Sequence, residues 1–458
     1  MALAVHLPTL DHQVVADGGQ FLYMGETIRD GGVPYVDAAN NKGPVLYLLF
    51  ALFDAIVGTS SAALRLTQIP FLAAAALGLA AYVARYAGRL AGGFAGVLFA
   101  SITALESSRG MDIESEQYGV APMFCALALA VRPGARLAAA AGALVSTAAL
   151  INPTFALVAP FVAFEAWKAA HPDTRRRKTI AALALGAAAP LLATVAWLGP
   201  LGALDDMVTQ VGGQISQAGG AIGGRIDVTF GIVENPSVWF LPSYGLWGLA
   251  ALSFVAALRA RSLWRPALVL AGICGAVLLR IKLAHYELPY QYYPALPALA
   301  GLLALALAAL VPDRPRTRLA AALAALALIQ AAVILPLNHI RLAPPEDRAQ
   351  TATGPVAAFI RRATEPGDTL VAAGAHAELY WLAGRRAPNR FFDIFGLLGS
   401  RRYPAQRDRQ LARRPPDAVA FVAPRRLWAD PPVEELVRRG PYELAYSRDG
   451  STVWLRRP

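Results

Sequence analysis

Long apolar runs separated by short polar loops dominate residues 61–337. A helix of about 20 apolar residues can cross a bilayer, and a shorter one can do so when it is broken or partly buried in a bundle. The pattern predicts ten spans: Ser61–Ala84, Leu90–Ala104, Gln117–Val131, Leu137–Ile151, Pro153–Lys168, Ile180–Gly199, Ser237–Leu258, Pro266–Leu279, Gln291–Val311 and Leu319–Leu337. We therefore expect an α-helical polytopic membrane protein.

Two segments depart from this pattern. Gly43–Gly58 is apolar but short and contains Asp54, which favours a helix lying at the membrane interface. Residues 338–458 are rich in arginine and proline and contain no apolar span. We predict a membrane domain over residues 1–337 and a small soluble α/β domain over residues 338–458.

The soluble domain carries alternating short strand and helix patterns. Its closing hairpin is centred on Asp449-Gly450, a dipeptide that favours tight β-turns. The predicted strands are Thr369–Ala373, Ala418–Val422, Glu443–Ser447 and Thr452–Leu455. The predicted helices are Val356–Arg362, His376–Ala383 and Val433–Arg439.

The composition agrees with a chain whose main solvent is lipid. Of the 458 residues 56% are hydrophobic and 16% are charged, and the mean hydropathy is +0.43. These values exclude a disordered chain, a basic nucleic-acid-binding domain and a disulfide-built secreted domain. No nucleic-acid partner is expected despite the net charge of +11. Cys125 and Cys274 both lie in apolar spans and read as small buried thiols.

The loop charges predict which side of the membrane each loop faces. One set of loops carries about fifteen basic residues and the other about four, so the positive-inside rule puts the first set in the cytoplasm. The basic set is Arg85, Arg89, Arg132, Arg136, Lys168, Arg175, Arg176, Arg177, Lys178, Arg259, Arg261, Arg265, Arg314, Arg316 and Arg318. The other set, with Arg109, Arg225, Arg280 and Lys282, then faces outward, as does the C-terminal domain.

Ten spans place both chain ends outside, yet residues 1–60 carry no signal peptide. We therefore expect an upstream first span to be missing from the printed sequence, as when a start codon is assigned too late.

The first outward segment gathers acids and a lysine beside the bilayer. Asp17, Asp37 and Lys42 lie here with Tyr35. A carboxylate at this place can take a proton from a hydroxyl, and a lysine can hold a phosphate. The glycines that follow Asp17 also fit ordinary turn chemistry.

Two later outward loops also carry candidate chemistry. Asp112, Glu114 and Glu116 alternate, so in an extended loop they share one side and could bind a metal or orient an acceptor, or they form a solvated acidic loop. Arg280, Lys282 and His285 stand at the mouth of a span, where they could capture a lipid phosphate. Tyr286 and the tyrosines after it are typical of an interfacial aromatic belt.

The order of these motifs resembles a known family. An acid in the first outward loop precedes "PYVDAANNKGPVLYLLFALFDAIVG", an acid pair precedes the third span, and "HYELPYQYYPALPALAG" precedes a late span. The chain is similar to membrane glycosyltransferases of the GT-C type, in particular the bacterial ArnT-like and RgtA-like branch related to protein O-mannosyltransferases. The likeness covers about Val14 to Leu310, and the tail resembles the outward domain of many bacterial members.

The resemblance implies roles for individual residues. Asp17 matches the base that activates the acceptor, although Gly18 stands where the family often has a second acid. Lys42 matches the lysine associated with the donor phosphate. The acid of the second loop matches Glu116, with Glu114 as rival, and the family's "HY" matches His285 and Tyr286. Arg280 and Lys282 are further candidates for contact with the phosphate. Tyr35 and Asp37 are candidates for contact with the substrate.

The resemblance also implies the reaction. Such enzymes take a sugar from a polyprenyl-phosphate carrier and transfer it with inversion to an envelope acceptor, which is a lipid, a glycan or a protein. The expected location is the bacterial inner membrane, with the catalytic loops facing the periplasm. No cofactor is certain, and a divalent metal is left open. A transporter or flippase for a lipid-linked sugar and a non-catalytic truncated relative are the alternatives.

Overall fold

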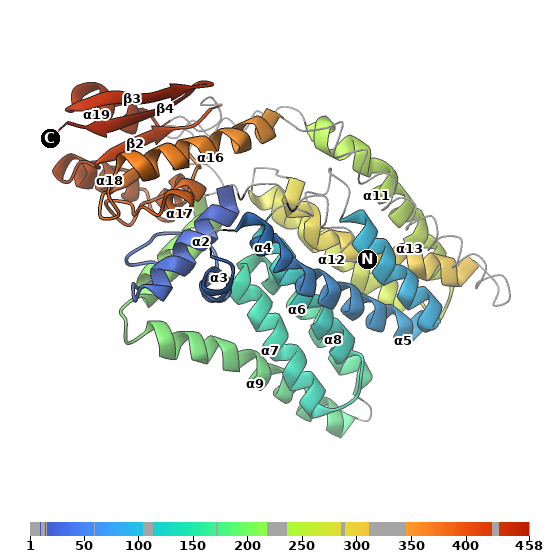
Figure 1. Cartoon of the computed structure of the whole chain (residues 1–458). Coiled ribbons are helices and arrows are strands. Elements are labelled where there is room, and N and C mark those ends of the chain that lie inside the picture. Colours follow the sequence, from blue (N-terminus) through green and yellow to red (C-terminus); the bar gives the residue numbers. More distant parts are fainter. Residues whose placement is uncertain are drawn as a thin grey trace. The chain divides into compact units, whose positions relative to one another are not determined.

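The computed structural model describes residues 10, 14, 16–58, 60–103, 113–170, 173–217, 236–284, 289–310, 345–423 and 430–457. The chain divides into two compact units, whose elements are labelled in Figure 1. The first unit comprises residues 1–10, 65–194 and 234–341. The second comprises residues 11–64, 195–233 and 342–458. The sequence analysis predicted one division at residue 338, between a membrane domain and an outward domain. That division does not coincide with the two compact units, and it stays a prediction.

The second unit combines N-terminal helices with the C-terminal α/β segment. It contains α2 (Ala16–Arg29), α3 (Pro44–Val57), α10 (Leu204–Gln217), α16 (Pro345–Ala363), β1 (Leu370–Ala372), α17 (Glu378–Ala383), η6 (Ile394–Gly399), α18 (Tyr403–Arg413), β2 (Ala418–Phe421), α19 (Pro431–Arg439), β3 (Tyr442–Arg448) and β4 (Ser451–Arg456). The N-terminal segment that carries Asp17 and Lys42 and the C-terminal residues 345–457 therefore belong to one compact body.

A small sheet forms the core of the tail. Its order is β1-β2-β4-β3, with β1 parallel to β2 and the other pairs antiparallel. Central β2 is buried throughout, which explains its apolar sequence AVAF. Asp449 and Gly450 both have positive φ, at +49° and +79°, as a tight hairpin turn requires. The predicted small C-terminal sheet is confirmed.

Helix α18 was not predicted, because charged and polar residues dominate its sequence YPAQRDRQLAR. Its buried side is formed by Tyr403, Arg407 and Leu411, and Arg407 makes a buried ion pair there. Arg407 Nη1 donates to Asp430 Oδ2 at 2.8 Å and Arg407 Nη2 to Asp430 Oδ1 at 2.9 Å. Both side chains are more than nine-tenths buried, so the fork-shaped pairing satisfies each charge.

Helix α3 exposes one apolar stripe, and its predicted position at the membrane interface stays a prediction. Pro44 opens it, and Gly58 ends it with a φ of +55°. Leu48, Leu52 and Ile56 recur every four residues and are 43%, 56% and 71% exposed, so they form one apolar stripe. The opposite side is buried within the second unit.

The first unit is helical in its described part. It contains most or all of α5 (Gln68–Ile102), α6 (Ser115–Ala130), α7 (Ala135–Ile151), η3 (Pro153–Val158), α8 (Ala159–Ala169), α9 (Asp173–Leu198), α11 (Pro236–Arg259), α12 (Trp264–Ala284), η4 (Pro289–Ala295) and α13 (Leu296–Leu310), and the short helix α4 (Ser61–Leu66) is divided between the two units.

Four stretches of the described chain are long and apolar enough to cross a membrane. They are Ser61–Ile102, Arg175–Leu198, Trp264–Ile281 and Tyr290–Leu310. The prediction of ten spans is therefore not confirmed. Shorter apolar helices include Ala135–Ile151 and Leu246–Arg259, and the predicted span Leu319–Leu337 lies outside the described residues.

Helix α5 contains a reversal at Gly88. This residue has φ +85° and ψ 166°, which interrupts the helix. A Cβ on Gly92 would lie 2.4 Å from the Ala80 carbonyl oxygen, and one on Gly96 would lie 2.8 Å from that of Ala76. Because these pairs run in opposite directions, the two halves of α5 pack antiparallel, in agreement with the two apolar runs predicted there.

A buried carboxylate joins three helices of the first unit. Glu165 of α8 is fully buried and accepts hydrogen bonds from Tyr82 at 2.8 Å and Tyr86 at 2.7 Å, both on α5. Arg265 of α12 forms an ion pair with the same carboxylate. These contacts satisfy the Glu165 charge, so we interpret the cluster as a structural cross-link.

We expect Glu165→Ala to destabilise the first unit strongly. The variant leaves Arg265 without its counter-ion, and breaking a buried pair in this way costs about 3–5 kcal/mol. The matched control is Glu435→Ala, which removes only solvent-exposed ion pairs with Arg438 and Arg439 and should change stability little. Thermal unfolding of detergent-purified protein checks this, and equal losses in the two variants would contradict it.

Candidate functional site

Asn40 is the centre of a buried hydrogen-bond network in the second unit. Its Nδ2 donates to Gln20 Oε1 at 2.8 Å, and its backbone N–H donates to Gln210 Oε1 at 2.9 Å. Its Oδ1 accepts from Tyr47 Oη and from the Asn41 N–H, both at 2.8 Å. Asn40 is fully buried. Four hydrogen bonds on one residue tie α2, α3, α10 and the loop before Lys42 together.

Asp17 lies in the first turn of α2 at one end of this network. Its Oδ1 accepts from Gln20 Nε2 at 3.3 Å, and Gln20 in turn accepts from Asn40. Asp17 is only partly buried, so one carboxylate oxygen is anchored while the group keeps some exposure. An acid at a helix N-terminus is also favoured by the helix dipole. A carboxylate that is anchored on one side and keeps some exposure is accessible to a neighbouring hydroxyl.

Lys42 is held at the other end. Its backbone N–H donates to Tyr47 Oη at 2.9 Å, and its carbonyl accepts from Tyr35 Oη at 2.8 Å. The residue is 6% exposed. The structure therefore brings Asp17, Tyr35 and Lys42, three predicted site residues, into one connected network of the second unit.

Tyr35 supports the Lys42 loop. It is fully buried with φ +71°, an unusual conformation for a residue other than glycine. Its carbonyl accepts from Gln210 Nε2 at 2.8 Å, which helps to hold this backbone. Burial raises the pKa of Tyr35 well above its ordinary value, so its hydroxyl is a neutral donor. A substrate contact by Tyr35 stays a prediction.

Asp37 has a local role in the described structure. It is exposed, and its Oδ2 accepts from the Val33 backbone N–H at 2.6 Å within a turn. This contact accounts for an aspartate at that position, and its predicted substrate contact is untested.

Asp393 is a buried acid that the sequence analysis missed. It is 3% exposed, and its Oδ1 accepts from the Phe395 N–H at 2.8 Å. Burial raises the pKa of Asp393 well above its ordinary value, and the nearby carboxylates of Asp17 and Glu378 raise it further. Asp393 is therefore a buried acid that binds its proton more tightly than an exposed aspartate does. Nothing in its local sequence, FFDIF, distinguishes it from an ordinary loop residue.

A second cluster lies in the first unit around Glu116. This residue is fully buried in the first turn of α6, and its Oε1 accepts from Arg280 Nη2 at 3.2 Å and Asn152 Nδ2 at 3.1 Å. Its Oε2 accepts from Ser115 Oγ at 2.9 Å. Two predicted site residues from distant loops, Glu116 and Arg280, thus form an ion pair. Asn152 also accepts from the Thr154 N–H at 3.2 Å, which connects this pair to the start of η3.

The remaining candidates have different outcomes. Glu114 is the N-cap of α6, and its backbone N–H donates to Gln117 Oε1 at 3.0 Å in a capping box. Its substrate contact stays a prediction. The side chain of Lys282 and the whole of Asp112, His285 and Tyr286 lie outside the described residues.

The described residues contain no group of three or more His, Cys, Asp and Glu side chains placed to hold a metal ion. Arg280 also occupies one oxygen of Glu116 with a positive charge. These residues do not form a typical metal centre, and we derive no step through a metal.

Solved structures with the same fold cover the whole chain. ArnT from Cupriavidus metallidurans in the apo state matches with a TM-score of 0.67 at 15% identity, covering 100% of this chain and 97% of that one. The apo oligosaccharyltransferase of Archaeoglobus fulgidus gives 0.55 at 13% identity, covering 100% and 73%. Arabinofuranosyltransferase AftD from Mycobacteria gives 0.51 at 15% identity, covering 99% and 39%.

All three are GT-C glycosyltransferases, so the chain has the GT-C fold and the resemblance found in its sequence is confirmed at that level. No family model and no curated protein matches the sequence.

We expect Asp393→Asn to remove a pH-dependent penalty on folding. Because the folded-state pKa is raised, the stability linked to this group is present below the ordinary value near 3.8 and is lost as pH rises toward the folded-state pKa. Asparagine can still accept from Phe395 and is neutral throughout. In thermal unfolding between pH 4 and 8, the wild-type Tm should therefore fall relative to that of the variant as pH rises. A difference that stays constant with pH would contradict this account.

Proposed function

We propose that this protein is a membrane glycosyltransferase that moves a sugar from a polyprenyl-phosphate carrier to an acceptor in the cell envelope. The observation that carries the proposal is the full-length likeness to ArnT, whose structure bound to undecaprenyl phosphate matches with a TM-score of 0.65. An archaeal oligosaccharyltransferase with a tethered acceptor peptide shares the fold at 0.50. The four long apolar helices fit a lipid-borne donor.

In the proposed reaction the acceptor hydroxyl attacks the anomeric carbon of the sugar. The new carbon–oxygen bond forms as the bond from that carbon to the phosphate oxygen breaks, which inverts the configuration. Asp17 takes the hydroxyl proton, and the bonding electron pair leaves with the polyprenyl phosphate. The partial exposure of Asp17 and its single anchor to Gln20 support this role as base.

The departing phosphate needs positive charge. Lys42 is the first candidate, because its backbone is fixed on both sides by Tyr47 and Tyr35. Arg280 is the second, because its Nη2 is committed to Glu116 while its buried Nη1 has no hydrogen-bond partner among the described residues. Lys282 and His285 are further candidates from the sequence.

In this proposal Glu116 orients Arg280 through their ion pair. Glu116 therefore has a positioning role in addition to its predicted catalytic role. Tyr35, Asp37, Glu114 and Tyr286 are the proposed substrate contacts. We further propose that the site opens on the outer face of a bacterial inner membrane, with residues 338–458 on the same side. The imbalance of basic residues between the two sets of loops supports this orientation.

We expect Asp17→Asn to abolish sugar transfer without preventing membrane insertion. The amide cannot take the acceptor proton, and loss of a general base slows a reaction by about 10²–10⁴-fold. One polyprenyl-phosphate sugar should therefore accumulate in a deletion strain carrying this variant, as it should in the deletion strain itself. Mass spectrometry of extracted lipids measures this pool.

The matched control is Asp205→Asn, which neutralises an exposed acid in the first turn of α10. It should restore the wild-type lipid profile. Near-normal turnover by Asp17→Asn would contradict the assigned base. An unchanged lipid pool in the deletion strain would contradict the proposed enzyme and favour a transport or inactive role.

A further inference from the structure

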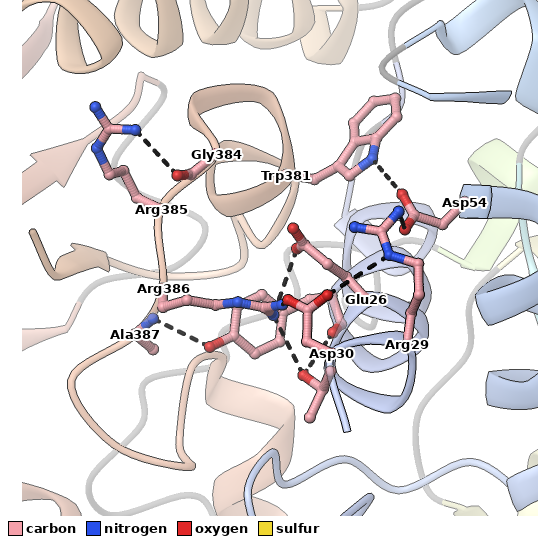
Figure 2. Close-up of polar contacts among 11 residues, drawn as sticks. Glu26, Arg29, Asp30, Asp54, Trp381, Gly384, Arg385, Arg386 and Ala387 are labelled. Atoms are coloured by element: carbon pink, nitrogen blue, oxygen red, sulfur yellow. Dashed lines mark hydrogen bonds and ion pairs between the residues drawn. The ribbon is translucent and has the colours of Figure 1, made fainter. Parts of the chain in front are cut away.

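Within the second unit, residues 376–397 of the C-terminal α/β segment contact the first outward segment. The contacted parts are α2, which carries Asp17, and the loop that leads to Lys42. Figure 2 shows some of the side chains that make these contacts. The contacts fall into three groups.

The first group is centred on Arg386, immediately before Ala387 in the loop after α17. Its Nη1 lies 3.4 Å from Glu26 Oε2, its Nη2 pairs with Asp30, and its guanidinium lies 5.2 Å from the centre of the Tyr23 ring. The Ala387 N–H donates to Tyr23 Oη at 3.0 Å. Figure 2 shows Arg386 directed toward Glu26 and Asp30 of the helix end. Arg386 Nη1 also donates to Thr27 Oγ1 at 3.4 Å, so Arg386 contacts four residues of α2 or its C-terminal end.

The second group packs α2 against α17. The Tyr23 ring stacks on Phe392 at 4.1 Å and lies 5.1 Å from the Tyr380 ring. Two residues from Asp17, a Cβ on Gly19 would lie 2.2 Å from the Glu378 backbone nitrogen. Only glycine allows the two backbones to approach this closely. The first turn of α2 is therefore in direct contact with the C-terminal segment.

The third group holds the loop before Lys42. The Ala39 N–H donates to the Arg390 carbonyl at 2.8 Å, and a Cβ on Gly396 would lie 2.4 Å from the Ala39 carbonyl oxygen. Arg390 Nη1 also pairs with Asp206 of α10 at 2.8 Å. Ala39 directly precedes Asn40, the centre of the buried network.

We propose that residues 376–397 position Asp17 and Lys42, with Arg386 as a positioning residue, so that the C-terminal segment is a working part of the transfer site. This inference rests on the proposed function. Misplacing a reacting group by about 1 Å can cost roughly 100-fold in rate. A small tilt of α2 is therefore enough to impair the base without unfolding the protein.

The test compares Arg386→Ala, Arg386→Lys and the control Arg438→Ala in detergent-purified full-length protein. Arg438 is an exposed residue of α19 that pairs with Glu435. Hydrogen exchange reports on residues 16–43, and transfer is measured with the lipid-linked sugar that the deletion strain accumulates. In Arg386→Ala, exchange over 16–43 should rise while exchange over β1–β4 stays unchanged.

The same variant should lower kcat by about 10-fold or more and change KM for the lipid donor by less than about 3-fold. Arg386→Lys keeps the charge opposite Glu26 and Asp30 and should recover most of the rate, and Arg438→Ala should behave as wild type. Faster exchange with unchanged kcat, or unchanged exchange, would overturn the positioning role. If Arg386→Ala speeds exchange over the whole sheet, Glu26→Gln replaces it as the test variant. Glu26→Gln removes the partner charge from α2, and the same changes in exchange and kcat are expected of it.

A wild-type protein that transfers no sugar would overturn the proposed function and this inference together. An active wild type with an unimpaired Arg386→Ala variant would overturn only this inference.

Discussion

The burial of Asn40 is the constraint on which the candidate site depends. A buried amide must pair both its donor and its acceptor, and an unpaired group costs about 1–3 kcal/mol. Asn40 meets this demand with bonds to Gln20, Gln210, Tyr47 and the Asn41 N–H. Gln20, Tyr47 and the Asn41 N–H pair with the Asn40 side chain, and Gln210 pairs with its backbone N–H, so the residue is fully satisfied only when α2, α3, α10 and the Lys42 loop are arranged together.

The first unit contains a similar buried hydrogen-bond network, in which the central residue is the carboxylate of Glu116. Glu116 is fully buried and is satisfied by Asn152, Ser115 and Arg280. In both clusters neutral amides and hydroxyls fix the groups to which we assign chemistry. Such networks hold a reacting group rigidly while adding few charges to an apolar chain, because a dipole is cheaper to bury than an ion. The low charged fraction of the chain, 16%, agrees with the use of neutral dipoles in place of buried ions.

The apolar runs predicted the helices well, and Asp449-Gly450 predicted the closing hairpin, because both signals are local. Tyr35 and Lys42 could also be selected from sequence as members of one charged and aromatic segment. Asn40, Asn152 and Asp393 could not be, because their importance comes from tertiary partners 20 or more residues away or from burial alone. Helix α18 was missed for a related reason, since its buried side combines Tyr403 and Leu411 with the charged Arg407, which is satisfied only through its tertiary partner Asp430.

The most direct test of the account is release of the lipid carrier by the purified protein. Wild-type protein and Asp17→Asn would be incubated with the lipid-linked sugars and envelope acceptors extracted from the deletion strain, and free polyprenyl phosphate would be measured by mass spectrometry. The account predicts release by the wild type and at least about 100-fold less by the variant. No release by the wild type, or equal release by both proteins, would contradict it.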